Sequence, residues 1–199
     1  MIIGLTGYKF SGKDETANFI ISKTKDTLRF HKYSFAGPLK KTVGEMFGWN
    51  DDDLNDPNLK EKTDEFWGVS PREILQWMGT DIARIALPNR FPELKKLHGE
   101  NFWIKTFIRW YKNQSNKNVI ISDVRFTNEA QLIKSEGGIL IRVHRDSVVP
   151  STINHPSENV ELLQPLVDIN VSNNGTIEDL WENTNLVINY IHRQHGETQ

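Results

Sequence analysis

The chain has 199 residues, with 24 Lys and Arg against 26 Asp and Glu, and its net charge of −2 gives no reason to expect a long nucleic acid as a partner. Its hydrophobic residues (37%) form no long apolar run, so the sequence predicts one folded, cytoplasmic domain without a membrane span or a signal peptide. Because cysteine is absent, disulfides, thiolate metal sites and a cysteine nucleophile are excluded, and a metal ion would be held by oxygen.

Strand and helix patterns alternate at the start of the chain and give way to a mainly helical stretch. Ser70, Pro71 and Glu73 form a helix-start signature, and Pro88 and Pro92 are expected to break that helix. The acidic stretch at 50–57 lacks the spacing of a calcium loop and is expected to be a solvated loop. The predicted elements are strands at 1–6 and 28–35 and helices at 14–24, 38–47, 70–87 and 101–111.

The second half returns to alternating strands and helices. The apolar run 118–123 ends in an acid, as buried parallel strands often do, and Gly137-Gly138 closes the helix that follows it. Residues 146–166 are expected to be irregular, and the tail from His192 to be frayed. The predicted elements are strands at 118–123, 139–143 and 167–171 and helices at 126–136 and 176–191. This alternation predicts the α/β class, with a parallel sheet covered by helices on both faces.

A phosphate-binding loop is the most informative motif. The first strand runs into Gly7-x-x-x-x-Gly12-Lys13, and a helix pattern follows. The glycines let backbone N–H groups curl round an anion, and Lys13 can reach the β- and γ-phosphates of a nucleoside triphosphate. Position 14, where such loops usually carry a Mg²⁺-binding hydroxyl, is Asp14, which is either a Mg²⁺ ligand or a first-turn acid favoured by the helix dipole.

Several polar residues follow the carboxyl ends of predicted strands, where this kind of sheet binds its ligands. Asp14, Ser34, Asp123 and Arg145 are therefore expected at one edge of the sheet. Asp123 resembles the acid that contacts Mg²⁺ in P-loop proteins, and the alternative is a helix-capping aspartate.

Transfer of a phosphoryl group between two anionic substrates needs cations to hold the acceptor and to neutralise the group in flight. Lys9, inside the loop, and Arg125, just after Asp123, are the strongest candidates, whereas Arg142 alternates with an apolar neighbour and is as well explained by solvent exposure. Further candidates are Lys40, Arg72, Arg84 and Arg145. Arg72 and Arg84 lie twelve positions apart on one predicted helix, with Gln76 and Thr80 between them, and are expected close to the same face of it.

Aromatic and histidine side chains leave two interpretations open. Trp77 suits stacking on a base, but Trp77 and Trp103 are at least as well explained as core residues. His155 lies in an irregular polar segment, where binding and simple surface exposure are both reasonable.

Six segments together resemble the deoxynucleoside monophosphate kinases of bacteriophages and related viruses. Their order matches along nearly the whole chain. They are Gly7–Asp14, Ala36–Lys40, Leu75–Asp81, Ser122–Arg125, His155–Glu158 and Asn173–Thr176.

The resemblance implies the three-layer P-loop kinase fold with a parallel central sheet, a helical acceptor-binding region at about 36–115 and a lid at about 146–160. It implies transfer from ATP to a deoxynucleoside monophosphate with Mg²⁺, in deoxynucleotide biosynthesis, and leaves a homodimer open. The implied catalytic residues are Lys9, Lys13, Asp14, Arg125 and Arg145. The implied ATP-binding residues are Gly7, Ser11, Gly12, Lys13, Asp14, Glu15, Thr16, Arg145, Asn173, Asn174 and Gly175, with Asp14 and Asp123 as metal ligands. The implied acceptor-binding residues are Lys40, Arg72, Gln76, Thr80, Asp81, Arg84, Trp103, Asp123, Arg125, His155 and Glu158.

Two other functions compete. Animal-type phosphomevalonate kinases share the loop with its Asp14, the Gly37–Lys40 segment and the Ser122–Arg125 strand end, so these motifs alone do not choose the acceptor. A P-loop binding module without kinase activity is the third hypothesis. A GTPase is disfavoured because Asn116-Lys117 lacks the aspartate of a guanine-recognition element, and a motor is disfavoured because Val124 follows Asp123 where an acid would activate water.

Overall fold

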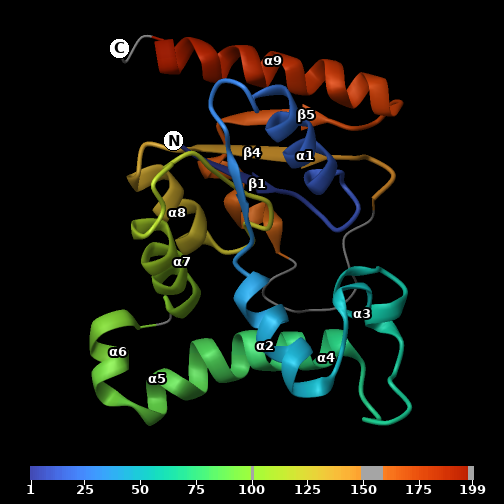
Figure 1. Cartoon of the computed structure of the whole chain (residues 1–199), viewed down its shortest axis with the longest axis vertical. Helices are drawn as coiled ribbons and strands as arrows, with labels where there is room; N and C mark the ends of the chain where they lie inside the picture. Colours follow the sequence, from blue (N-terminus) through green and yellow to red (C-terminus); the bar gives the residue numbers. More distant parts are fainter. Residues whose placement is uncertain (100, 149–158, 197–199) are drawn as a thin grey trace. The chain divides into compact units, whose positions relative to one another are not determined.

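Five parallel strands form the centre of one compact unit, which comprises Met1–Ser34 and the chain from Gln114 onward (Figure 1). The computed structural model describes residues 1–99, 101–148 and 159–196, with side chains described up to Arg193. The strand order is β2-β3-β1-β4-β5, so the predicted parallel α/β sheet is confirmed. The strands are β1 (Ile2–Thr6), β2 (His31–Tyr33), β3 (Val119–Ile121), β4 (Ile139–His144) and β5 (Ile169–Ser172).

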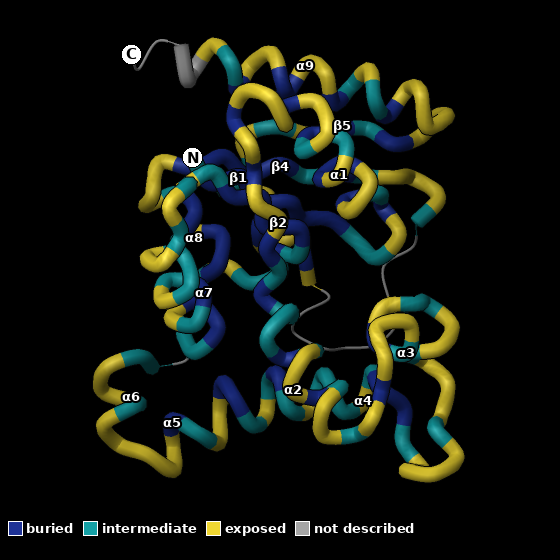
Figure 2. The backbone as a smooth tube through the Cα atoms, viewed as in Figure 1, coloured by how far each residue is buried: buried dark blue, intermediate teal, exposed yellow. Residues whose placement is uncertain are grey.

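Helices cover both faces of this sheet, as the alternation of its side chains requires. Ile3 and Leu5 of β1 belong to the core shared with helices α1 (Lys13–Lys23) and α9 (Ile177–Gly196). On the other face, a Cβ on Gly4 would touch Ile133 of helix α8 (Thr127–Ser135). Figure 2 shows β1 and β4 as mainly buried, whereas β2 at the edge of the sheet is mostly exposed. The three-layer arrangement with a parallel central sheet that was expected from the sequence is therefore present.

The register brings the ends of the strands to one edge. Gly4 pairs with Ile121 and Tyr33 also pairs with Ile121, while Thr6 pairs with Arg142. His144 pairs with Ser172 in the same direction. Because all the strands are parallel, the loops that follow them lie at their common carboxyl edge, where ligands bind in this architecture.

The second compact unit, Phe35–Asn113, contains helices and no strand among its described residues. Its elements are α2 (Gly37–Phe47), α3 (Asp51–Asn55), the 3₁₀ turn η1 (Leu59–Glu61), α4 (Pro71–Gln76), η2 (Trp77–Ala86), α5 (Leu87–Arg90), α6 (Pro92–His98) and α7 (Phe102–Lys112).

The middle of the long helix in this unit is a π-helix of 10 residues, η2. At its end the backbone N–H of Leu87 bonds to the carbonyl of Ile82, five residues earlier. The expectation that Pro88 breaks the helix is wrong, because helical backbone continues through α5 to Arg90. Pro88 lies where the π-helical hydrogen bonds of η2 give way to the α-helical ones of α5. Its missing N–H is therefore tolerated there, as it is in the first turn of a helix.

Local hydrogen bonds explain other differences from the predicted elements. The 50–57 segment contains the short helix α3 rather than only a loop, because the Asn50 side chain accepts from the N–H groups of Asp52 and Asp53. Within the irregular stretch predicted at 146–166, η4 (Val160–Leu166) is a 3₁₀ helix. The last helix continues to Gly196 instead of fraying from His192.

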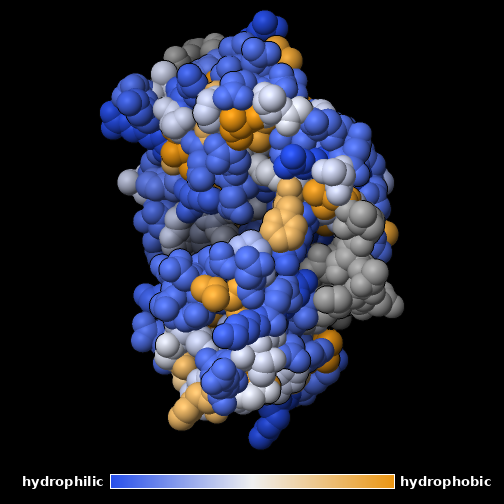
Figure 3. Space-filling model, turned by 90° about the vertical axis from the view of Figure 1, so that its right-hand side faces the viewer, coloured by the Kyte–Doolittle hydropathy of each residue, from blue (hydrophilic) through white to orange (hydrophobic). Residues whose placement is uncertain are grey.

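Among the residues that the structure describes, no helix combines the length and the hydropathy that a bilayer crossing would need. Figure 3 shows one face of the molecule as mainly hydrophilic, with hydrophobic residues scattered over it, which is ordinary for a protein surface.

Candidate active site

The loop between β1 and α1 has the backbone geometry that its glycines permit. Gly7 and Gly12 have φ angles of 140° and 102°. A Cβ on Gly7 would lie 2.2 Å from the Val143 carbonyl oxygen, and one on Gly12 would lie 2.5 Å from the Asn173 amide nitrogen. Side chains at either position would therefore push the loop off the sheet edge. Phe10, at φ 67°, is also left-handed, so this non-glycine residue carries strain inside the loop.

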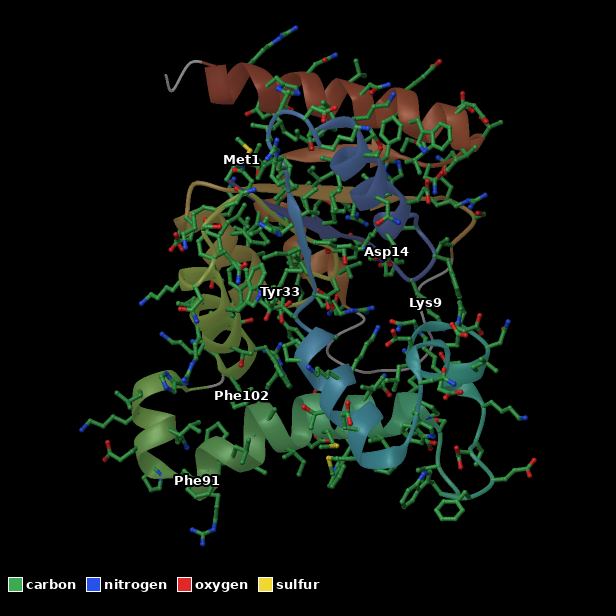
Figure 4. All side chains as sticks on the ribbon, viewed as in Figure 1. Met1, Lys9, Asp14, Tyr33, Phe91 and Phe102 are labelled. Atoms are coloured by element: carbon green, nitrogen blue, oxygen red, sulfur yellow. The ribbon has the colours of Figure 1, made fainter. Side chains whose placement is uncertain are left out.

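Lys13 is held inside this loop. Its Nζ donates to the carbonyl oxygens of Gly7 at 2.9 Å and Tyr8 at 2.6 Å, and the residue is only 9% exposed. The ammonium charge is thus fixed between the two ends of the loop, where a polyphosphate would lie. Figure 4 shows Lys9 and Asp14 on the same loop-to-helix segment, and the Lys9 Nζ lies 4.9 Å from the centroid of the Phe10 ring.

Two buried hydroxyls at the loop fit an anionic ligand. Among the described residues, the hydroxyls of Thr6 and Ser11 have no hydrogen-bond partner, although both atoms are buried. A Cβ on Gly7 would lie 2.8 Å from the Ser11 hydroxyl, which therefore faces across the loop. Because buried hydroxyls normally find a partner, these donors are suited to phosphate oxygens. The Thr16 hydroxyl instead donates to the Gly12 carbonyl.

Asp14 lies in the first turn of α1 and is surrounded by donors. Its carboxylate is 2.9 Å from the Nζ of Lys32 on β2. The Asp14 side chain is exposed, and desolvation by its neighbours would by itself raise its pKa, but the hydrogen bond and charge of Lys32, the charge of Lys13 and a hydrogen bond from Ser122 together hold this pKa below its usual range. Asp14 is therefore an anion at neutral pH.

Asp123 follows β3 at the same edge. Its carboxylate accepts from the Ser34 hydroxyl at 2.6 Å, which joins two residues that the sequence predicted at one edge. Burial and then the charge of Asp123 raise the pKa of Tyr33, so Tyr33 stays a neutral phenol. Ser122 hydrogen-bonds to Asp14 and directly precedes Asp123, which brings both predicted metal ligands to one strand end.

The donor set fits Mg²⁺, a cation that prefers oxygen and is often bound through one or two carboxylates together with substrate phosphates. Asp14 and Asp123 supply two such carboxylates next to the phosphate loop. No group of three or more His, Cys, Asp or Glu side chains able to hold a metal ion occurs among the described residues. The arrangement thus suits a metal ion that arrives with a nucleotide.

Arg125 is positioned by a buried acid that the sequence interpretation missed. Glu129 of α8 is 1% exposed, and its carboxylate accepts from the backbone N–H groups of Arg125 at 2.9 Å and Phe126 at 3.1 Å. This contact fixes the backbone where Arg125 leaves the strand end. The position of Glu129 three residues into the helix was the available signal.

The loop after β5 is tied to its neighbours. The buried Asn173 amide donates to the Ser11 carbonyl at 2.9 Å. The Asn174 amide donates to the Asp146 carboxylate and accepts from the Asp146 N–H, both at 2.7 Å. A Cβ on Gly175 would lie 2.1 Å from the Asp179 carboxylate, which caps α9 through Thr176. Both amides are engaged within the protein. Arg145 is exposed nearby, and Glu15 accepts from the Trp181 indole at 3.3 Å.

The remaining predicted acceptor residues that the structure describes belong to the helical unit. Lys40 donates to Asn55 at 2.6 Å, and Arg72 lies 3.4 Å from the Glu61 carboxylate. The Trp103 indole donates to the Gly79 carbonyl at 2.8 Å and is buried, which is the geometry of a core residue.

The π-helix changes the face assigned to Arg72 and Arg84. An α-helix of 3.6 residues per turn separates positions twelve apart by a third of a turn, so the one-face expectation is wrong for an α-helix. The wider turns of η2 bring positions four apart closer to one face. On this helix Arg72, Gln76, Thr80 and Arg84 are buried or half-buried, whereas Asp81 is exposed. The Gln76 amide nitrogen is buried and finds no hydrogen-bond partner in the described part of the chain.

Three predictions fall wholly or partly outside the described residues. They are His155, Glu158 and most of the lid predicted at 146–160.

Comparisons with known proteins show the family of this chain. A family model described as deoxynucleotide monophosphate kinase matches residues 59–184. A protein of Acanthamoeba polyphaga mimivirus, provisionally named a deoxynucleotide monophosphate kinase, is 42% identical over 188 residues, which cover 91% of this chain and 92% of that protein. Among solved structures, the dephospho-CoA kinase from Campylobacter jejuni aligns over 98% of both chains, with 12% identity and a TM-score of 0.44.

Proposed function

Because this chain belongs to the deoxynucleotide monophosphate kinase family, we propose that it moves the γ-phosphate of ATP to a deoxynucleoside 5′-monophosphate. An oxygen of the acceptor phosphate attacks the γ-phosphorus, the bond between that phosphorus and the β–γ bridging oxygen breaks, and the products are ADP and the deoxynucleoside diphosphate. Such a reaction needs positioning and positive charge more than covalent participation by the protein.

The observation that carries this proposal is the position of Lys13. Its ammonium lies within the loop, beside the unpartnered hydroxyl of Ser11 and at the end of α1 whose N–H groups point toward an anion. In the proposed complex Lys13 and the loop amides hold the β- and γ-phosphates. Lys9, on the same loop, adds a second positive charge.

The two acids and the strand-end arginine divide the remaining work. Asp14 and Asp123 would hold Mg²⁺, which neutralises charge on the transferred phosphoryl group when bound. Arg125 holds the acceptor phosphate, because a guanidinium can bind two phosphate oxygens at once. Arg145 and the loop at Asn174 and Gly175 are the proposed contacts of the adenine.

Acceptor recognition is assigned to the helical unit. Residues of α2, α4 and η2 provide the polar groups for it, and the buried Gln76 amide is the strongest candidate to hydrogen-bond a base, because it lacks a partner among the described residues. The proposed acceptor contacts are Lys40, Arg72, Gln76, Thr80, Asp81 and Arg84.

A coupled assay of ADP release tests the proposal across dAMP, dCMP, dGMP, dTMP, their ribose counterparts and phosphomevalonate. We expect at least one deoxynucleotide to be the best acceptor, with much slower release without acceptor. Preferred turnover of phosphomevalonate would assign the chain a different acceptor class. ATP binding without transfer to any of these compounds would favour a binding module.

Arg125 provides a second test. Arg125→Ala should raise the KM for the acceptor and lower kcat while ATP affinity stays nearly constant, and Arg125→Lys should restore little because a point charge cannot replace a two-pronged fork. The matched control is Arg193→Ala, which removes an exposed arginine of α9. Loss of ATP binding with an unchanged acceptor KM would assign Arg125 to the donor instead.

A further inference from the structure

A path of hydrogen bonds leads from strand β4 to the phosphate-loop lysine. Arg142 of β4 donates to the Glu161 carboxylate of η4 from both of its terminal nitrogens, with Nη1 at 2.9 Å from Oε2. The same guanidinium also donates to the Gln164 side chain. The Arg142 side chain is 14% exposed and the Glu161 side chain is 53% exposed, so the guanidinium is shielded from water while the carboxylate is only partly covered.

Glu161 also contacts the phosphate loop. Its Oε1 accepts from the Tyr8 hydroxyl at 2.9 Å, across 153 positions of sequence. The backbone carbonyl of Tyr8 in turn accepts from the Lys13 Nζ at 2.6 Å and from the Ser11 N–H at 3.2 Å. One residue therefore contacts Glu161 with its side chain and holds Lys13 with its backbone.

The geometry gives this contact more weight than an ordinary surface ion pair. Exposed pairs are usually weak because water screens them and both side chains lose freedom on pairing. Here both terminal nitrogens of the Arg142 guanidinium bind the Glu161 carboxylate. This bidentate contact fixes the orientation in which Glu161 accepts the hydrogen bond from Tyr8. Burial and the hydrogen bond to Glu161 raise the pKa of Tyr8, while the hydrogen bond from Arg142 lowers the pKa of Glu161, so the phenol remains the donor and the carboxylate the acceptor.

We propose that Tyr8 is a positioning residue for ATP binding: its hydroxyl, held by the Arg142–Glu161 pair, fixes the loop carbonyl that holds Lys13. A loop that is already in its binding geometry pays less ordering entropy when a triphosphate arrives. Loss of the Tyr8 hydroxyl should therefore lower the affinity for ATP more than the rate of transfer, because Tyr8 itself contributes no charge to the transferred group. The inference rests on ATP being the donor, as proposed above.

Direct measurement of ATP binding by calorimetry, on the full chain and without acceptor, tests the proposal. Tyr8→Phe deletes only the hydroxyl, and Glu161→Gln removes the negative charge that pairs with Arg142. Each variant should weaken ATP binding by about three- to tenfold, the range expected for the net contribution of one ordinary intramolecular hydrogen bond. The KM for ATP should rise by a similar factor, while kcat and the KM for the acceptor stay near wild type.

Matched controls come from α9. Tyr190→Phe and Glu182→Gln make the same chemical changes at exposed positions for which the described residues offer no hydrogen-bond partner. Both should bind ATP as wild type does. The double variant Tyr8→Phe with Glu161→Gln should bind ATP no more weakly than the weaker single variant, because both changes break one path.

Equal ATP affinity of wild type and Tyr8→Phe would overturn the proposal. A lower unfolding temperature with unchanged ATP affinity would also overturn it, since Tyr8 would then support only the attachment of η4. If the wild-type chain itself binds no ATP, the proposed function fails instead, so the two failures are distinguishable. If a single variant does not fold, Arg142→Lys replaces it, and unchanged ATP affinity in that variant contradicts the proposal equally.

Discussion

The side-chain amide of Asn173 donates a 2.9 Å hydrogen bond to the backbone carbonyl of Ser11. The backbone N–H of Asn173 also donates to the His144 carbonyl at 2.8 Å, so one residue after β5 fastens the phosphate loop to the sheet edge. The sequence interpretation counted Asn173 among the residues that contact ATP. Its geometry instead supports the loop that would hold the phosphates.

Replacement of Asn173 should therefore affect both stability and ATP binding. Asn173→Asp places a carboxylate against the Ser11 carbonyl in a buried position, and we expect a loss of about 1–3 kcal/mol in the free energy of unfolding together with weaker ATP binding. Chemical denaturation and calorimetry measure the two effects. Asn170→Asp, at an exposed position on β5, is the matched control. Wild-type stability and affinity in Asn173→Asp would mean that the hydrogen bond to Ser11 is unimportant.

Asp14 offers a test of the metal site. Asp14→Asn keeps the size of the side chain but removes its charge, so the Mg²⁺ concentration needed for half-maximal turnover should rise more than the dissociation constant for metal-free ATP. The comparison variant is Glu178→Gln, which removes a first-turn acid from α9. An unchanged Mg²⁺ titration in Asp14→Asn would leave Asp14 as a helix-terminus acid paired with Lys32.

Trp103 should act in the core of the helical unit rather than on the acceptor. Trp103→Phe deletes the indole N–H that bonds to Gly79, and burial of the orphaned carbonyl should cost about 1–3 kcal/mol of unfolding free energy, with the acceptor KM unchanged. Trp67→Phe removes a similar bond to Phe47 at an exposed site and should cost less. A rise in the acceptor KM without destabilisation would restore Trp103 to the binding site.

Acid should weaken the helical unit through Asp64. Its carboxylate accepts from the Trp49 indole at 2.8 Å and from the N–H groups of Phe66 and Trp67, and these bonds, the indole first, hold the pKa of Asp64 below its usual range. Folding therefore disfavours protonation. The stabilisation is present above the unfolded pKa of about 4 and is lost as the pH falls through the lower folded value. Urea midpoints measured across this pH range should show that acid lowers the stability of Asp64→Asn less than that of wild type. An equal loss of stability in both proteins would refute this assignment.

Local patterns predicted much of the fold. The apolar run of β1 and the Gly7–Lys13 spacing located the phosphate loop, and the Ser70–Glu73 signature located the start of α4, where the capping bonds are present. These features depend on neighbours a few residues apart, which a sequence pattern contains. The π-helix was not predictable in this way, because periodicity does not reveal a change in hydrogen-bond pattern near Pro88.

Long-range contacts account for what the site interpretation missed. The sequence explained Arg142 as well by solvent exposure as by function. Its partner Glu161 lies 19 positions further along the chain, so the residues near β4 do not predict this contact. The hydrogen bond from Asn173 to Ser11 spans 162 positions. The residue types at the strand ends were predictable, whereas their partners depended on the register of the sheet.

The most direct test of the central claim is to identify the product of a reaction with ATP labelled at the γ-phosphate. Wild-type enzyme with Mg²⁺ and its best deoxynucleoside monophosphate should yield labelled deoxynucleoside diphosphate, separated by chromatography, in amounts equal to the ADP formed. Lys13→Met should yield none while retaining cooperative thermal unfolding, because it removes the charge proposed to hold the β- and γ-phosphates and, within the fold, two hydrogen bonds to loop carbonyls. Label found solely in inorganic phosphate, or an equal yield of labelled diphosphate from a folded Lys13→Met, would contradict the account.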